Sequence, residues 1–308
     1  MVEPGVRAFV QTRGTARATD YAFLGGAPPE PWWRAYRDAT AFDHPTVLVT
    51  SDGARWAAYL SGIPSSRIDA VGTVVRYTLV LDGPCGVADA ACVPAVTGAW
   101  IDDVAATHGA RPGGRLAAAL DTRFPAADVE RWLAEPASPR LLADERPTRP
   151  TGSDERAARP VPEVSRRAMA ALAALAPVPD APDVAGDWIG AVGAPAPRAA
   201  FTARVTSLVT GTPGRALLLN LVGGAADAQP LLDPASPVAV LVESTDPRLA
   251  RCTALQPVVE AKKVPPPATP ARRVGVAAVA GIAVVPLMAA FGVLAATVLV
   301  LTLLVWLL

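Results

Sequence analysis

The last stretch of the sequence constrains this chain most, because no charged residue occurs from Val274 to Leu308. A helix of this length would measure about 52 Å at about 1.5 Å per residue. The hydrocarbon core of a bilayer is about 30 Å thick and is crossed by about 20 residues. The stretch is therefore too long for one upright span and too short for two. We predict a single C-terminal transmembrane segment over residues 274–308, with its membrane core close to residues 287–306.

Composition within the stretch places that core. Residues 274–285 are mostly Gly, Ala and Val, and Pro286 would kink a helix. The Leu-rich part that follows ends near Trp306, and indole side chains favour the membrane interface. The charged residues that flank the segment all precede it, so the positive-inside rule predicts a cytoplasmic location for the preceding part of the chain. These flanking cations are Lys262, Lys263, Arg272 and Arg273.

Four small residues share one face of the predicted helix. Small residues at helical spacing allow membrane helices to approach closely, so the face predicts self-association into a homo-oligomer. A high content of Ala and Gly accounts for the same residues without any such role, and both interpretations stay open. A pore lined by charge is excluded, because the segment carries none. The four residues are Ala277, Gly281, Gly292 and Ala296.

Composition limits the function classes further. Lys and Arg total 28, as do Asp and Glu, so the chain lacks the basic excess of a nucleic-acid-binding protein. Three cysteines without repeated spacing do not suggest a disulfide framework, and the segment MVEPGVRAFVQTRG does not resemble a secretory signal. Both features favour a reducing, cytoplasmic compartment. With only two histidines and no Cys or His pair at zinc-finger spacing, we expect no metal centre. GTPGRALL lacks the Lys-Ser/Thr ending of a phosphate loop and GGRLAAAL lacks the dinucleotide pattern, so we expect no cofactor.

Proline-rich stretches divide the chain. We predict an α+β N-terminal domain, a linker rich in Pro and charge, a smaller α+β second domain, a basic Pro-rich juxtamembrane spacer and the transmembrane segment. Their ranges are 1–134, 135–163, 164–260, 261–273 and 274–308.

Local patterns predict the elements of each domain. In the first, two β-rich runs flank Ser51-Asp52-Gly53 as in a hairpin, and the strand at 73–83 completes an antiparallel meander. Helices should follow at 87–107, 113–121 and 125–134. In the second domain, Ser165 is the predicted N-cap of a helix, and a hairpin is predicted around Gly211 and Gly214. Another strand is predicted in PVAVLVEST.

Catalytic chemistry has weak support in the sequence. Cys85 or Cys92 could pair with His108 in space, as in a thiol nucleophile with its base. No family signature surrounds either cysteine, and both are better explained as core residues. We therefore assign no catalytic residue, although a membrane-tethered hydrolase stays open as an alternative.

A polar set on or beside the strands of the first domain is the remaining candidate site. Arg67 and Asp69 lie in the loop SSRIDAVGT, where Arg–Asp pairing would fix the loop through charge-assisted hydrogen bonds. The same residues could instead line a groove for a ligand or partner. The full set is Gln11, Arg13, Asp20, Tyr21, Arg67, Asp69 and Arg76.

The segment FVQTRGTARATDYAFLGG, followed by SSRIDAVGTVVRYTLVLDG, resembles the N-terminal domain of bacterial GTPase-associated conflict-system proteins. The family pattern is Gln, an Arg-Gly or Tyr-Gly turn, a Leu-rich strand, and later Arg-x-Asp with a Gly-led strand. This chain departs from it at Thr73, after Gly72, and lacks a His in the first motif. The resemblance implies an accessory protein acting with a GTPase or other NTPase in defence against phage, and it assigns no catalytic residues.

These features together predict a single-pass membrane protein with cytoplasmic N-terminal domains, acting as an adaptor or sensor and localised by its C-terminal helix. The alternative is another class of protein, a membrane-perturbing effector in which the C-terminal segments associate on activation.

Overall fold

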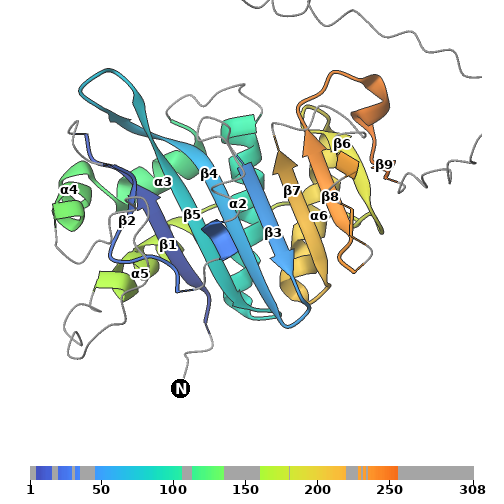
Figure 1. The fold of residues 1–308 in the computed structure, drawn as a ribbon, viewed down its shortest axis with the longest axis horizontal. Coiled ribbons are helices and arrows are strands. Elements are labelled where there is room, and N and C mark those ends of the chain that lie inside the picture. The colour runs from blue at the N-terminus through green and yellow to red at the C-terminus, as the bar shows by residue number, and fades with distance from the viewer. Residues whose placement is uncertain are drawn as a thin grey trace, which may run out of the picture. The chain divides into compact units, whose positions relative to one another are not determined.

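The computed structural model describes residues 5–15, 20–29, 32–34, 46–105, 113–134, 160–179, 181–219, 228–229, 232–233 and 235–255. Residues Met1–Val258 form one compact unit. Its described part is α+β, as predicted, with a mixed nine-stranded sheet in the order β2-β1-β5-β4-β3-β7-β8-β6-β9 (Figure 1).

One half of the sheet is antiparallel and matches the predicted meander. Strand β3 pairs with β4, which pairs with β5, and β5 pairs with β1. The β3–β4 turn forms because Asp52 Oδ1 accepts hydrogen bonds from the backbone N–H groups of Ala54 at 2.8 Å and Arg55 at 2.7 Å. Gly53 supplies the positive φ of 93°. The strands are β1 (Arg7–Thr12), β2 (Ala22–Phe23), β3 (Thr46–Ser51), β4 (Arg55–Ile68) and β5 (Val74–Pro84).

The other half contains a β-α-β crossover. Strands β6 and β7 both pair with β8 in parallel, and helix α6 connects β6 to β7. The predicted hairpin around Gly211 and Gly214 is wrong, because its first arm lies in α6. Pro195 at the first turn begins the helix, and Gly211, with a φ of 121°, follows its end. The elements are β6 (Trp188–Ala191), α6 (Pro195–Thr210), β7 (Gly214–Leu219), β8 (Val238–Val242) and β9 (Thr253–Ala254).

Strands β3 and β7 join the two halves. They pair antiparallel through six residue pairs, from Thr46 with Leu219 to Ser51 with Gly214. Pairing satisfies backbone groups that would otherwise form two exposed sheet edges. The segments predicted as separate domains, 1–134 and 164–260, therefore contribute strands to one sheet rather than to two.

The structure confirms the predicted helices at 113–121 and 125–134, and it shows the described part of the one predicted at 87–107 as three consecutive helical segments. They are η1 (Ala88–Ala91), α2 (Cys92–Trp100), η2 (Ile101–Ala105), α3 (Arg115–Arg123) and α4 (Ala126–Ala134). A short helix, η4 (Pro247–Ala250), precedes β9.

Helix α5 (Pro160–Leu172) corrects two expectations. The last residues of the predicted linker, 160–163, are its first turn, and residues 135–159 lie outside the described part. Ser165 is inside the helix and not its N-cap. Its hydroxyl accepts a hydrogen bond from the backbone N–H of Ala8 at 3.0 Å. Ser165 thus satisfies a donor on the outer edge of β1.

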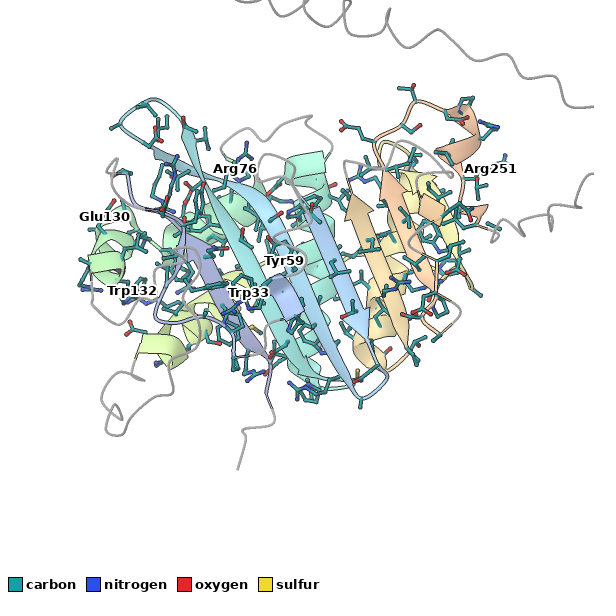
Figure 2. The ribbon with its side chains drawn as sticks, in the orientation of Figure 1. Trp33, Tyr59, Arg76, Glu130, Trp132 and Arg251 are labelled. Carbon is teal, nitrogen blue, oxygen red and sulfur yellow. The ribbon has the colours of Figure 1, made fainter. Side chains whose placement is uncertain are left out.

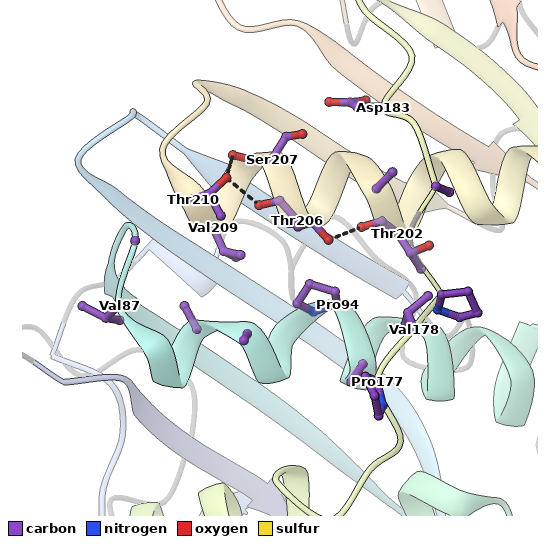
Figure 3. A pocket seen from close by; sticks show the side chains of 17 residues that line it. Val87, Pro94, Pro177, Val178, Asp183, Thr202, Thr206, Ser207, Val209 and Thr210 are labelled. Carbon is purple, nitrogen blue, oxygen red and sulfur yellow. Dashed lines mark hydrogen bonds between the residues drawn. The ribbon is translucent and has the colours of Figure 1, made fainter.

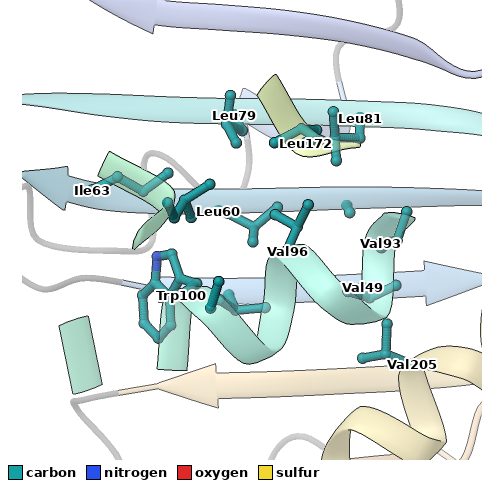
Figure 4. Packing of buried hydrophobic residues seen from close by; sticks show 14 of the residues in the cluster. Val49, Leu60, Ile63, Leu79, Leu81, Val93, Val96, Trp100, Leu172 and Val205 are labelled. Carbon is teal, nitrogen blue, oxygen red and sulfur yellow. The ribbon is translucent and has the colours of Figure 1, made fainter. Parts of the chain in front are cut away.

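The larger core lies between the sheet and the helical layer. Val93, Val96 and Trp100 of α2 project toward the aliphatic side chains of β3, β4 and β5 (Figure 4). The indole of Trp100 donates to the carbonyl of Ser61 at 2.8 Å. A second buried cluster on the opposite sheet face includes Phe9 and Tyr59. Both faces of the central strands are therefore buried.

No helix in the described ranges is long and apolar enough to cross a membrane. The predicted spacer at 261–273 and the segment at 274–308, with its flanking cations, Trp306 and the small-residue face, lie outside those ranges.

Candidate functional site

The end of the β4–β5 hairpin, residues 65–75, brings together much of the predicted polar set; we call it the hairpin tip. Asp69 Oδ1 accepts hydrogen bonds from the backbone N–H groups of Val71 at 2.9 Å and Thr73 at 2.8 Å. Its Oδ2 accepts from Arg13 Nη2 at 2.6 Å. The aspartate therefore closes the turn and ties it to the segment after β1.

These contacts lower the pKa of Asp69 below its ordinary value. The backbone N–H of Thr73 has the largest effect, followed among the favourable contacts by the N–H of Val71 and by Arg13. A lowered folded-state pKa means that the carboxylate stabilises the fold above its unfolded pKa. That contribution is lost as the pH falls through the folded value.

Arg67 makes a second tie. Its side chain is buried, and the residue is only 8% exposed. The guanidinium donates to the carbonyl of Arg13 at 2.7 Å and to the hydroxyl of Thr12 at 2.6 Å. It also lies 4.9 Å from the ring centre of Tyr77. The expected pairing of Arg67 with Asp69 is thus replaced by two separate ties to residues 12–13.

Tyr21 and Arg76 extend the same cluster. The Tyr21 hydroxyl accepts a hydrogen bond from the backbone N–H of Arg76 at 3.1 Å. The Arg76 guanidinium donates to the carbonyl of Gly62 at 2.9 Å, and the Arg13 guanidinium lies 5.4 Å from the Tyr21 ring centre. The structure therefore connects Arg13, Tyr21, Arg67, Asp69 and Arg76.

The other two predicted residues lie apart from these contacts. Gln11 is buried within β1, where its backbone pairs with Phe23 on one side and Thr78 on the other. Asp20 is exposed and is not joined to the cluster by the hydrogen bonds given above.

Sequence reasoning missed two carboxylates that brace the tip, Asp121 directly and Glu130 through Thr15, whose carbonyl accepts the backbone N–H of Ala70. Asp121 of α3 accepts hydrogen bonds from the Ser66 backbone N–H at 2.7 Å and the Tyr77 hydroxyl at 3.0 Å. Glu130 of α4 accepts from the Thr15 backbone N–H at 2.7 Å and its hydroxyl at 3.0 Å. Figure 2 labels Glu130 and Arg76 on α4 and β5. Residue spacing in the sequence carries no signal of these contacts.

The braced tip presents two aliphatic side chains to solvent. Ile68 is 55% exposed and Val71 is 59% exposed, and they are the exposed large hydrophobic residues of the described chain. Asp69 and Arg67 are engaged within the protein, so the apolar pair, beside the exposed Ser66 and Thr73, is the feature of this end of the hairpin that suits an apolar surface on another molecule.

The predicted cysteine–histidine pair involves His108, which lies outside the described residues. The two cysteines lie within them. Cys85 Sγ is 3.5 Å from Ser51 Oγ. Burial raises the pKa of the Cys92 thiol to about 11, with a smaller contribution from Asp89. Cys92 is therefore protonated at neutral pH, unlike an activated nucleophile.

We expect iodoacetamide at pH 8 to alkylate Cys92 about a hundredfold more slowly in the folded chain than in the urea-unfolded chain. The two-unit difference between a pKa of about 11 and the ordinary 9.0 accounts for this factor. Peptide mass spectrometry over a time course measures it. Similar rates in both states would contradict the assignment of Cys92 as a buried, protonated thiol.

Within the described ranges, no group of three or more His, Cys, Asp or Glu side chains is placed to hold a metal ion. Comparison of the chain with protein-family models, curated proteins and solved structures finds no match.

Proposed function

We propose that this chain is a membrane-tethered adaptor or sensor whose hairpin tip binds a protein partner on the cytoplasmic side. The observation that carries the proposal is the exposure of Ile68 and Val71 on a tip held by Asp69, Arg67 and the two bracing carboxylates. The charge-free segment at 274–308 and the cations before it support the tether and its orientation.

Bracing of the tip favours binding because less conformational entropy is lost when a partner docks. The turn is closed by Asp69, and the backbone N–H of Ala70 donates to the carbonyl of Thr15 at 3.2 Å. Two aliphatic side chains on such a tip suit an apolar pocket on the partner, where they would act as central anchors.

The size of the tip argues against a second copy of the chain as this partner. A specific, stable interface buries at least about 1,200 Å² in total. Two tips meeting through Ile68 and Val71 alone would bury far less. Any homo-oligomer is better attributed to the small-residue face of the predicted membrane helix. The resemblance to conflict-system accessory proteins suggests an NTPase as the partner.

The double substitution Ile68→Ser/Val71→Ser is expected to abolish partner binding while changing the free energy of unfolding by no more than about 0.5 kcal/mol, since both side chains are exposed. A photocrosslinking residue at Ala70 of the full-length chain, in its native membrane, would report the contact. We expect one crosslinked protein, lost in the double variant and retained in Thr73→Ser.

The same crosslinked products in the double variant would show that the tip is not the docking element. An equal loss in Thr73→Ser would also count against the apolar pair, because that control keeps both aliphatic side chains.

A further inference from the structure

In the described part of the chain, three cavities are lined by residues of η1 or α2 together with neighbouring segments. The first, about 360 Å³, lies between α2 and α6; we call it the hydroxyl pocket. The second, about 310 Å³, lies farther along the same two helices and is called the arginine pocket. The third, about 510 Å³, lies between α2 and α5 and is lined mainly by Ala, Leu and Met.

The segment 176–179 separates the first two cavities. Pro177, Val178 and Pro179 line both of them. Val178 packs on Gly98, where an added Cβ would lie 3.0 Å from Val178 Cγ2. Gly98 therefore makes room for the valine, which acts as the wall between the two pockets.

The hydroxyl pocket uses its polar groups internally. Thr202, Thr206 and Thr210 donate their hydroxyls to carbonyls of their own helix, as the dashed lines in Figure 3 show for two of them. Asp183 at its rim receives the Arg204 guanidinium. These groups have little capacity left for a ligand.

The arginine pocket has a different charge arrangement. Arg115 begins α3, Arg198 lies in the first turn of α6, and Asp102 stands between them. Asp102 Oδ2 pairs with Arg115 at 2.8 Å, and its Oδ1 pairs with Arg198. Two guanidinium groups thus share one carboxylate, so the residues that line the pocket include two cations and one anion.

The neighbouring carboxylate, Asp103, points away from the pocket. Asp103 is buried, and its Oδ2 accepts a hydrogen bond from the backbone N–H of Leu116 at 2.6 Å. It therefore caps α3 and is not among the residues that line the pocket.

We propose that the arginine pocket binds a small organic anion, whose carboxylate or phosphate contacts Arg115 and Arg198 while its apolar body lies against the Ala, Pro and Gly wall. Cavities of about 300–1,000 Å³ with apolar walls and a few convergent polar groups are typical small-molecule sites. The volume places this pocket at the lower end of that range, so the ligand is a compact one.

Burial supplies a further argument. It lowers the pKa of Arg198, which means that the guanidinium is poorly solvated in its charged form. A ligand anion would add to the single carboxylate, Asp102, that Arg198 shares with Arg115. The residues that line the arginine pocket do not include the hairpin tip. A lack of anion binding would therefore not contradict the proposed binding of a partner at the tip.

Equilibrium dialysis of the full-length chain in nanodiscs, with empty nanodiscs as background, tests the site. The probes are hexanoate and phenyl phosphate, with hexanol as the uncharged counterpart and inorganic phosphate as the head group alone. We expect saturable binding of at least one organic anion and no saturable binding of hexanol. The two organic anions distinguish a carboxylate from a phosphate ligand.

Charge substitutions give effects of opposite sign. Arg115→Met removes the excess cation from an exposed position and should weaken binding about tenfold. Asp102→Asn increases the positive charge and should strengthen binding. Arg248→Met, at an exposed ion pair with Asp246 in η4, is the control and should leave binding unchanged.

The proposal is overturned if neither organic anion binds saturably. It is also overturned if Arg115→Met binds as the unaltered chain does, or if Asp102→Asn binds more weakly. Binding of inorganic phosphate with the same affinity as phenyl phosphate would contradict a role for the apolar wall.

Discussion

Replacing Arg204 with methionine is expected to lower the free energy of unfolding by about 3–5 kcal/mol. Arg204 lies in α6 and is only 4% exposed. Its Nε donates to both oxygens of Asp183, at 2.9 and 3.1 Å, and its Nη2 donates to the carbonyls of Gly186, at 3.0 Å, and Val184. Methionine would fill similar space but would leave an aspartate and two carbonyls without their donor.

Urea unfolding of the unit 1–258, followed by circular dichroism, measures this effect. Arg204→Lys keeps the charge but cannot make the same forked contacts, so we expect an intermediate loss. Arg248→Met removes an exposed pair and should cost no more than about 1 kcal/mol. A loss of unfolding free energy below about 1 kcal/mol in Arg204→Met would show that the Arg204 contacts contribute little to stability.

A double-mutant cycle separates the ion pair from the carbonyl contacts. Asp183→Ala should cost less alone than Arg204→Met, because Asp183 is partly exposed, with 25% side-chain exposure, and the carbonyl bonds survive its removal. If the two single losses simply add in the double variant, the pair itself has no coupling energy, and the carbonyl contacts carry the effect.

The antiparallel half of the fold could be predicted because its signals are local. Ser51-Asp52-Gly53 encodes a turn through the aspartate side chain and the positive φ of Gly53. Alternating β-rich runs on either side then determine which strands pair. The helices after residue 87 were also predictable from their apolar spacing.

The crossover half could not be predicted in the same way. The second part of helix α6, residues 201–210, contains three Thr, two Val and one Phe, residue types that favour strands when their surroundings are ignored. Tertiary packing overrides this intrinsic preference, because the helix buries Phe201, Val205 and Leu208 in the core. The β3–β7 pairing joins residues far apart in the chain, and no local pattern reports such a contact.

The candidate site shows the same limit. Composition and strand position identified Arg67 and Asp69, but their partners come from the segment after β1 rather than from each other. The bracing by Asp121 and Glu130 depends on how α3 and α4 pack. The spacing of residues along the sequence carries no information on that packing. Likewise, Arg115 of α3 and Arg198 of α6 share Asp102 only because the tertiary fold brings the start of each helix to η2.

Removing residues 259–308 is expected to move the protein from the carbonate-resistant membrane pellet to the supernatant. The charge-free segment is the predicted anchor, and about 20 apolar residues suffice to span a bilayer. A matched pair of substitutions tests the placement of its core. Val298→Arg lies near the middle of 287–306 and should cost about 2.5–3.5 kcal/mol of insertion free energy. Val279→Arg lies in the excess half before Pro286 and should leave insertion largely intact.

Membrane retention of the shortened chain would contradict the anchor, and equal loss of insertion in both arginine variants would contradict the core placement. Vesicle leakage measured with the same full-length protein separates an adaptor from an effector. An adaptor leaves dye-loaded vesicles sealed, even when the chain is crowded by crosslinking. Leakage that requires the close approach of Gly281 and Gly292, and that is lost when both become leucine, would favour the effector instead.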